Sequence, residues 1–241
     1  MAETMRIQQA LTVPEGAGVT VRRLMPVHGM LNFDPFVLWD HFDIATGGFP
    51  DHPHRGFEAI TYLFAGGMKH ADNLGNRGTV HAGGAQRFTA GRGLVHSEFP
   101  DGHAAGIQLW INLPGRLKGI PADYQQLQAG EIPEHDESGV RIRTIVGGGS
   151  PLRLHTPVEY LEIAMPATSH LNRDIPAGFR GFLYVIAGTL AAGDKTVRQG
   201  QALLIEDTTS VNLSAPEAAR LMWCFGKPHG EPIRQHGPYV D

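Results

Sequence analysis

The apolar and polar positions of this chain form one pattern that occurs twice. An apolar stretch over residues 59–68 is echoed over residues 181–190, and each stretch contains a glycine at the matching place. The aligned pairs are Tyr62 with Tyr184, Ala65 with Ala187, and Gly66 with Gly188. Short apolar stretches bounded by glycine are typical of strands joined by tight turns. The chain therefore contains a degenerate internal repeat of β-structure.

Each copy reads as strands separated by glycine turns and followed by a returning strand that ends in tryptophan. Leu109-Trp110 closes the first copy, and Met222-Trp223 closes the second. This layout predicts a small antiparallel barrel. We therefore expect an all-β protein made of two stacked, jelly-roll-like antiparallel barrels. The expected domains are residues 1–134, with the linker, and residues 135–241.

The segments outside the repeat carry weaker signals. Residues 141–146 alternate like a strand, and residues 121–127 begin with a proline that a first helical turn tolerates, which suggests a short helix. Residues 75–78, Gly-Asn-Arg-Gly, lack the lysine of a phosphate loop and read as a hairpin turn. Residues 226–241 show no regular element, so we expect a tail laid over the surface.

Composition supports this picture and excludes several function classes. Apolar residues make up 41% and charged residues 18%, with 31 glycines and 17 prolines, which favours a globular, turn-rich protein. The net charge is −4 without a basic cluster, so direct nucleic-acid binding is not expected. Cys224 is the single cysteine, which rules out an intrachain disulfide. The chain shows neither a signal-peptide core nor an apolar run of roughly 20 residues, so we expect a cytoplasmic protein.

Two short motifs combine histidine and carboxylate at strand spacing. His52 and His54 lie two residues apart, as do His96 and Glu98. Residues at i and i+2 of a strand point to the same face, so two neighbouring strands could present three imidazoles and a carboxylate to one point. Such ligands suit a first-row divalent metal, iron above all, with positions left open for chemistry. The same ligands also accept Mn, Co, Ni or Zn.

The second copy of the repeat loses these side chains. When the two copies are aligned, every candidate ligand is replaced. The replacements are His52 by Asp174, His54 by Pro176, Glu58 by Arg180, His96 by Leu213, and Glu98 by Ala215. We therefore expect one metal site, in the first barrel, with the second barrel as a scaffold.

Other polar residues near the motifs have competing interpretations. Glu58 could be a base, could orient a ligand imidazole, or could simply pair with Arg55 on a strand. His70, His81 and His103 are interpreted as ordinary polar positions near loops, and the four proposed ligands would themselves be solvated if both strands lay at the surface.

The motifs resemble those of the pirin family of the cupin superfamily. The matching stretches are Asp34–Phe36, Gly48–Glu58, Leu74–Gly78, Thr89–Glu98 and Gln108–Pro114. The resemblance implies a bicupin with one Fe(II)/Fe(III) ion in the N-terminal barrel, held by His52, His54, His96 and Glu98. In this family the carboxylate ligand comes from the second motif, which leaves Glu58 beside the site.

The family resemblance also implies an activity. We expect a dioxygenase, similar to quercetin 2,3-dioxygenase, that cleaves a flavonol-like enolic substrate with O₂, and in which Glu98 or Glu58 accepts the substrate proton. The alternative is a metal- and redox-dependent regulatory protein that binds a protein partner without turnover. A third reading is a cupin whose metal is structural.

Overall fold

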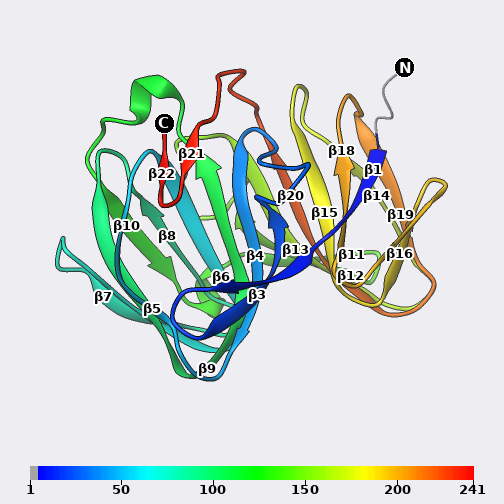
Figure 1. Cartoon of the computed structure of the whole chain (residues 1–241). Coiled ribbons are helices and arrows are strands. Elements are labelled where there is room, and N and C mark those ends of the chain that lie inside the picture. Colours follow the sequence, from blue (N-terminus) through cyan, green and yellow to red (C-terminus); the bar gives the residue numbers. More distant parts are fainter. Residues whose placement is uncertain (1–4) are drawn as a thin grey trace. The chain divides into compact units, whose positions relative to one another are not determined.

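The computed structural model describes residues 5–241, and β-strands dominate them (Figure 1). Within the described residues, helix is limited to two three-residue 3₁₀ turns, η1 (Gly115–Leu117) and η2 (Ala129–Glu131). The chain divides into two compact units, which we call the first and second barrels. The first barrel comprises residues 11–132, 152–156 and 229–241; the second comprises residues 5–10, 133–151 and 157–228.

The first barrel is one antiparallel sheet in the order β10-β8-β6-β9-β4-β3-β2, with β5 paired to β9 and β7 paired to β6. Its strands are β2 (Leu11–Glu15), β3 (Val19–Met25), β4 (Phe36–Ile44), β5 (Phe49–His54), β6 (Phe57–Asp72), β7 (Arg77–His81), β8 (Ala85–Thr89), β9 (Leu94–Asn112) and β10 (Asp123–Leu127). The two long strands, β6 and β9, pair along most of their length, and each of β4, β5, β7 and β8 pairs with one of them.

The second barrel consists of two sheets, β1-β18-β15-β20-β13-β12-β11 and β14-β19-β16-β17. Its strands are β1 (Met5–Gln9), β11 (Glu134–Glu137), β12 (Val140–Val146), β13 (Val158–Met165), β14 (Ser169–Asp174), β15 (Arg180–Ala187), β16 (Thr189–Ala192), β17 (Lys195–Arg198), β18 (Gln201–Ile205), β19 (Ser210–Ala215) and β20 (Ala219–Gly226). The strand predicted over residues 141–146 is confirmed as β12.

The internal repeat is confirmed by the strand order. In the first barrel β8, β6, β9 and β4 are successive neighbours, and in the second barrel β18, β15, β20 and β13 follow the same order. The strand order repeats, but the register does not: Tyr62 of β6 lies opposite Ile107 of β9, whereas Tyr184 of β15 lies opposite Met222 of β20, which the alignment matched to Leu109. The predicted all-β fold of two antiparallel barrels is therefore correct.

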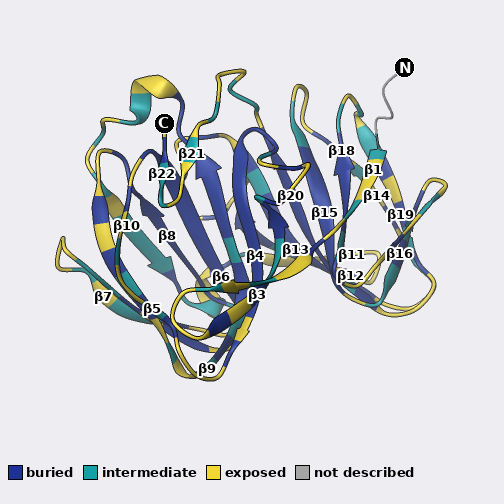
Figure 2. Cartoon of the chain, viewed as in Figure 1, coloured by how far each residue is buried: buried dark blue, intermediate teal, exposed yellow. Residues whose placement is uncertain are grey.

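The barrel interiors differ in polarity, although burial follows the strands in both (Figure 2). In the second barrel, an apolar cluster lies around Trp223 and Phe225. In the first barrel, apolar clusters lie around Phe57 with Trp110 and around Phe42. Buried polar side chains share the interior of the first barrel, among them His54, His96 and Glu98. A functional site is thus expected in the first barrel.

The helix predicted over residues 121–127 is wrong, because residues 123–127 form strand β10. Asp123 lies opposite Thr89 and Leu127 lies opposite Ala85, so β10 satisfies the open edge of β8. A proline just before the element fits an extended chain as well as a first helical turn, so the local signal was ambiguous and the strand edge decided the outcome. The hairpin turn near Gly75 is confirmed, although Arg77 and Gly78 already belong to β7.

The prediction that residues 226–241 contain no regular element is also wrong. Two-residue strands, β21 (Gln235–His236) and β22 (Tyr239–Val240), pair with each other. Residues 229–241, here called segment 229–241, belong by contacts to the first barrel, whereas the sequence placed them in the domain 135–241. Among the described residues, no helix is long and apolar enough to cross a membrane.

Candidate metal centre

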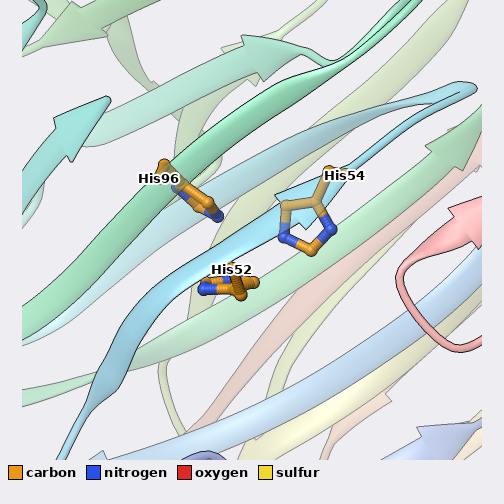
Figure 3. Close-up of side chains that lie close together, drawn as sticks. All are labelled: His52, His54 and His96. Atoms are coloured by element: carbon orange, nitrogen blue, oxygen red, sulfur yellow. The ribbon is translucent and has the colours of Figure 1, made fainter. Parts of the chain in front are cut away.

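The site begins with the antiparallel pairing of β5 and β9. His52 lies directly opposite His96, and His54 follows two residues after His52 on the same strand. The three imidazoles face one another (Figure 3), with ring centroids 4.4 Å apart for His52 and His96, 4.5 Å for His52 and His54, and 4.9 Å for His54 and His96. One potential ligand atom from each histidine lies within 4.8 Å of those of the other two.

Each of the three imidazoles has a partner at Nδ1. The distance from Nδ1 is 2.7 Å to the Pro50 carbonyl for His52, 3.3 Å to the Pro238 carbonyl for His54, and 3.4 Å to Nδ1 of His70 for His96. A carbonyl oxygen only accepts, so Nδ1 of His52 and of His54 must carry the proton. In a neutral imidazole this leaves Nε2 with a free lone pair, which is the atom a metal binds.

The His96 ring gives the most direct test of whether the residues fit a metal. Its Nε2 is buried and has no hydrogen-bond partner among the described residues. A buried polar atom without a partner costs free energy, and such atoms are rare in folded proteins. A metal ion bound at Nε2 would remove this penalty. The donor set of three imidazoles therefore fits a divalent transition metal.

The electrostatics of the cluster favour neutral imidazoles. Burial, followed by the neighbouring His52, lowers the pKa of His54 to about 3. Burial, followed by His54 and His52, also lowers the pKa of His96 well below its ordinary value. Neutral imidazole is the form that ligates a metal, so little proton release accompanies binding at these two residues near neutral pH.

Glu98 lies next to this cluster but in a different arrangement. Its buried carboxylate accepts hydrogen bonds from Thr61 Oγ1 at 3.1 Å and from Gln86 Nε2. The ligand atoms of Glu98, His96 and His70 form a second group within 4.8 Å of one another. The structure therefore brings three of the four predicted ligands into one cluster and places the fourth in an overlapping cluster that shares His96.

His70 was interpreted as an ordinary polar residue, and the structure shows that its ring lies beside that of His96, with Nδ1 atoms 3.4 Å apart. It is buried, stacks on Tyr124 with ring centroids 4.4 Å apart, and lies 3.3 Å from the Asp72 carboxylate through Nε2. The spacing of His70 and Asp72 on β6 is the same two-residue signal that identified the other motifs. His81 is exposed, and His103 pairs with Asp43 at 2.7 Å on a partly exposed side chain.

Glu58 is fully buried, but its hydrogen-bond partners are not residues of the histidine cluster. Its carboxylate accepts hydrogen bonds from the Thr89 hydroxyl at 2.9 Å and from the backbone N–H groups of His155 and Thr156 at 2.9 and 3.3 Å. The alternative pairing with Arg55 is not formed, because Arg55 makes a bidentate ion pair with Asp241 at 3.0 and 3.1 Å. The observed contacts of Glu58 fasten residues 152–156 to strands β6 and β8.

A cavity of about 640 Å³ opens beside the histidines. His52, His54 and Glu98 lie in its wall. The apolar part of the wall consists of Val21, Leu31, Leu38, Phe42, Phe49, Met68, Trp110 and Ile233. The remaining polar groups include Thr61, Gln108 and the ion pair of Arg23 with Asp40, in which Nε and Oδ1 are 2.8 Å apart.

Segment 229–241 also contributes to this wall, which the sequence did not indicate. Gln235, Gly237 and Pro238 line the cavity. Lys118 Nζ holds the segment in place by donating to the Val240 carbonyl at 2.8 Å, and Arg55 packs 4.8 Å from the centre of the Tyr239 ring. The hydrogen bond from His54 to Pro238 then makes this segment a direct support of a candidate ligand.

Comparison with known proteins gives consistent results. The family models for pirin and for the pirin C-terminal cupin domain match residues 18–111 and 160–241. Human pirin is 38% identical over 94% of this chain and 83% of its own length. A Pseudomonas aeruginosa protein named "Putative quercetin 2,3-dioxygenase" is 36% identical over 94% of this chain and 87% of its own length.

A solved structure extends the comparison to the fold. The crystal structure of quercetin 2,3-dioxygenase from Acinetobacter baumannii superposes with a TM-score of 0.90 at 27% identity, covering 98% of this chain and 90% of that chain. The repeated strand order, the histidine cluster and the match to both domain models lead to one conclusion: the chain is a member of the pirin family, with the bicupin fold.

Proposed function

We propose that this protein is a metal-dependent dioxygenase that holds one iron ion through His52, His54, His96 and Glu98. The observation that carries the proposal is the convergence of three imidazoles, each with Nδ1 already partnered, at the wall of a largely apolar cavity. Iron in such a site would supply a Lewis acid that acidifies an enolic hydroxyl and a redox partner for O₂.

The cavity supports a small aromatic substrate. Its volume of about 640 Å³ lies within the range typical of small-molecule sites, which are mostly apolar with a few placed polar groups. Trp110 and Phe42 offer apolar surface to a planar ring system, while Thr61 and Gln108 lie on the side of Glu98. A flavonol-like enol, with an apolar body and a few hydroxyls, matches this division. The names of the Pseudomonas and Acinetobacter proteins support quercetin as the first compound to test.

Glu98 is proposed as the residue that accepts the enolic proton. Its carboxylate lies in the cavity wall and is held by Thr61 and Gln86, so it stays near any substrate bound beside the histidines. Glu58 was the other candidate for this role. Its carboxylate is already surrounded by the Thr89 hydroxyl, the backbone N–H groups of His155 and Thr156, and the His155 ring nitrogen Nδ1, which supports a fastening role in its place.

The test is oxygen consumption by protein of known metal content. Protein stripped of metal is reloaded with Fe(II) without air, its iron content is measured, and O₂ uptake is recorded with quercetin. We expect uptake matched to quercetin loss in the wild type and none in His52→Ala. His103→Ala, which removes a partly exposed histidine outside both ligand clusters, serves as the matched control. No uptake from wild-type protein with one iron per chain would refute the proposal.

A second function, redox-dependent binding of a protein partner, has one observation in its favour. Strand β9 alternates buried His96 and Glu98 with the exposed apolar side chains of Val95 and Phe99, which are 37% and 42% exposed. A charge change at the metal would therefore act on the same strand that offers an apolar outer face. If iron-loaded protein consumes no O₂, this function predicts a partner whose affinity changes between Fe(II) and Fe(III).

A further inference from the structure

The three candidate histidines differ in what supports them. Nδ1 of His52 and of His54 meets a backbone carbonyl, whereas Nδ1 of His96 meets another imidazole, that of His70. The register of β6 and β9 creates this contact, because His70 lies opposite Glu98 and Asp72 lies opposite His96. Nδ1 of His96 is thus supported by the side chains of His70 and Asp72, which can be replaced by mutation, whereas backbone carbonyls cannot.

The positions of the protons on the two imidazoles follow from Asp72, the last residue in this series of hydrogen bonds. The Asp72 carboxylate only accepts, and His70 Nε2 lies 3.3 Å from it, so Nε2 of His70 carries the proton. With one proton per ring, Nδ1 of His70 is then an acceptor. His96 Nδ1, 3.4 Å away, must donate to it. The lone pair of His96 is therefore on Nε2, the buried atom without a partner.

We propose that His70 and Asp72 are positioning residues that hold His96 in the tautomer that presents Nε2 to the metal. This inference rests on the metal site of the proposed function. Its physical basis is general: an imidazole ligand is oriented, and made a better donor, by the acceptor of its other N–H. A carboxylate at the end of this series of hydrogen bonds strengthens that effect, because it polarises both imidazoles in the same direction.

Both positioning residues are held firmly. Oδ1 of Asp72 accepts the backbone N–H groups of Leu74 at 3.0 Å and Asn76 at 2.9 Å, and Oδ2 accepts the Asn76 amide at 2.8 Å. The His70 side chain is fully buried and stacks on Tyr124 at an interplanar angle of 18°. These contacts leave neither side chain free to rotate away from His96.

The second ligand group, His70 with His96 and Glu98, raises the alternative that His70 binds the metal itself. The hydrogen bonds argue against it, since Nε2 of His70 is directed to Asp72 and Nδ1 to His96. A metal on His70 would have to displace one of these partners. The two roles predict different metal stoichiometry after mutation, so they can be separated.

The first measurement uses the metal-free protein labelled with ¹⁵N-histidine. Long-range ¹H–¹⁵N correlation spectra report which ring nitrogen carries the proton, with His70→Phe and His96→Ala used for assignment. We expect His96 protonated at Nδ1 and His70 protonated at Nε2. A proton on Nε2 of His96 would overturn the proposal.

The second measurement uses Asp72→Asn, which should reverse the donor and acceptor roles in the hydrogen bonds that link residue 72, His70 and His96. The Asn oxygen remains with the two backbone N–H groups of the turn, so its amide faces His70 with N–H groups. His70 must then accept at Nε2 and donate from Nδ1, which moves the His96 proton to Nε2. We expect the affinity for Fe(II) or Co(II) to fall roughly 10–100-fold with one ion still bound per chain at saturation. Asp43→Asn, which alters the partly exposed pair with His103, should leave both tautomer and affinity unchanged.

The outcomes are decisive and independent of turnover. An unchanged His96 tautomer and unchanged affinity in Asp72→Asn would overturn the proposal. Loss of the bound ion at saturating metal in a folded His70→Phe protein would show His70 to be a ligand, which also overturns it. The expected tautomers and affinities in a protein that consumes no O₂ would support the positioning role while the dioxygenase function fails.

Discussion

Replacing Glu58 tests whether this buried carboxylate serves catalysis or fastening. In Glu58→Ala, the Thr89 hydroxyl and the Thr156 N–H lose their acceptor in the buried interior, whereas His155 is exposed enough to meet water. A buried donor without an acceptor costs about 1–3 kcal/mol. Two such donors predict a loss of about 2–4 kcal/mol in the free energy of unfolding, allowing for partial relaxation.

The isosteric Glu58→Gln separates charge from shape. Its carbonyl oxygen can still accept the two backbone N–H groups, so we expect a loss of about 1 kcal/mol, near the net value of one hydrogen bond. Urea denaturation at pH 7 measures both losses, and the melting temperature of Glu58→Ala should fall by roughly 5–15 °C.

Activity then decides between the two roles. If Glu58 only fastens residues 152–156, it does not touch the reacting groups and the activation free energy should change by well under the roughly 1.4 kcal/mol that corresponds to tenfold in rate. Iron-loaded Glu58→Gln should then retain O₂ uptake within about threefold of wild type. Glu98→Gln, which alters the carboxylate in the cavity wall, should lose far more. A loss of more than 100-fold in Glu58→Gln, with full iron content and no more than the expected loss of about 1 kcal/mol in stability, would refute the reasoning and make Glu58 the base.

Three further predictions concern other parts of the first barrel. Burial lowers the pKa of Lys118 to about 8 from its ordinary 10.5, so between these pH values the unfolded chain binds more protons than the folded protein. The free energy of unfolding of the wild type should therefore rise with pH across this range relative to that of Lys118→Met, and parallel curves of stability against pH would contradict this. Saturating metal at 100 times its Kd should stabilise the wild type by about 2.7 kcal/mol, and this gain should be absent in His96→Ala when melting is followed by calorimetry. Leu31 is 70% exposed at the cavity wall, so Leu31→Trp should raise the KM for quercetin severalfold without changing iron content; an unchanged KM would place the substrate elsewhere.

The second barrel shows how the sequence alignment and the strand register differ in detail. The sequence alignment matched His52 with Asp174 and His96 with Leu213. In the first barrel His52 pairs with His96 across two strands, and in the second barrel the residue that pairs with Leu213 is Leu171. Both leucines are buried in the apolar cluster. The residue equivalent to His52 by strand pairing is thus Leu171, three positions before the residue that the alignment gave, because loop lengths differ between the copies.

The sequence by itself determined what depends on local periodicity. The repeated apolar stretches are enough to predict two antiparallel barrels, since the alternation of a strand is a property of the strand alone. The same two-residue period placed His52 and His54 on one face of their strand, and His96 and Glu98 on one face of theirs. These inferences hold because they need no knowledge of which distant segments meet.

Tertiary structure decided everything that depends on long-range pairing. Residues 123–127 became a strand because β8 offered an open edge, and Asp72 reached His96 through the register of β6 and β9. The support of His54 by Pro238 joins residues 184 positions apart, and that of Glu58 by His155 joins residues 97 positions apart. Local sequence patterns cannot predict contacts between residues so far apart along the chain, because these contacts form only when the closed barrel brings the partners together.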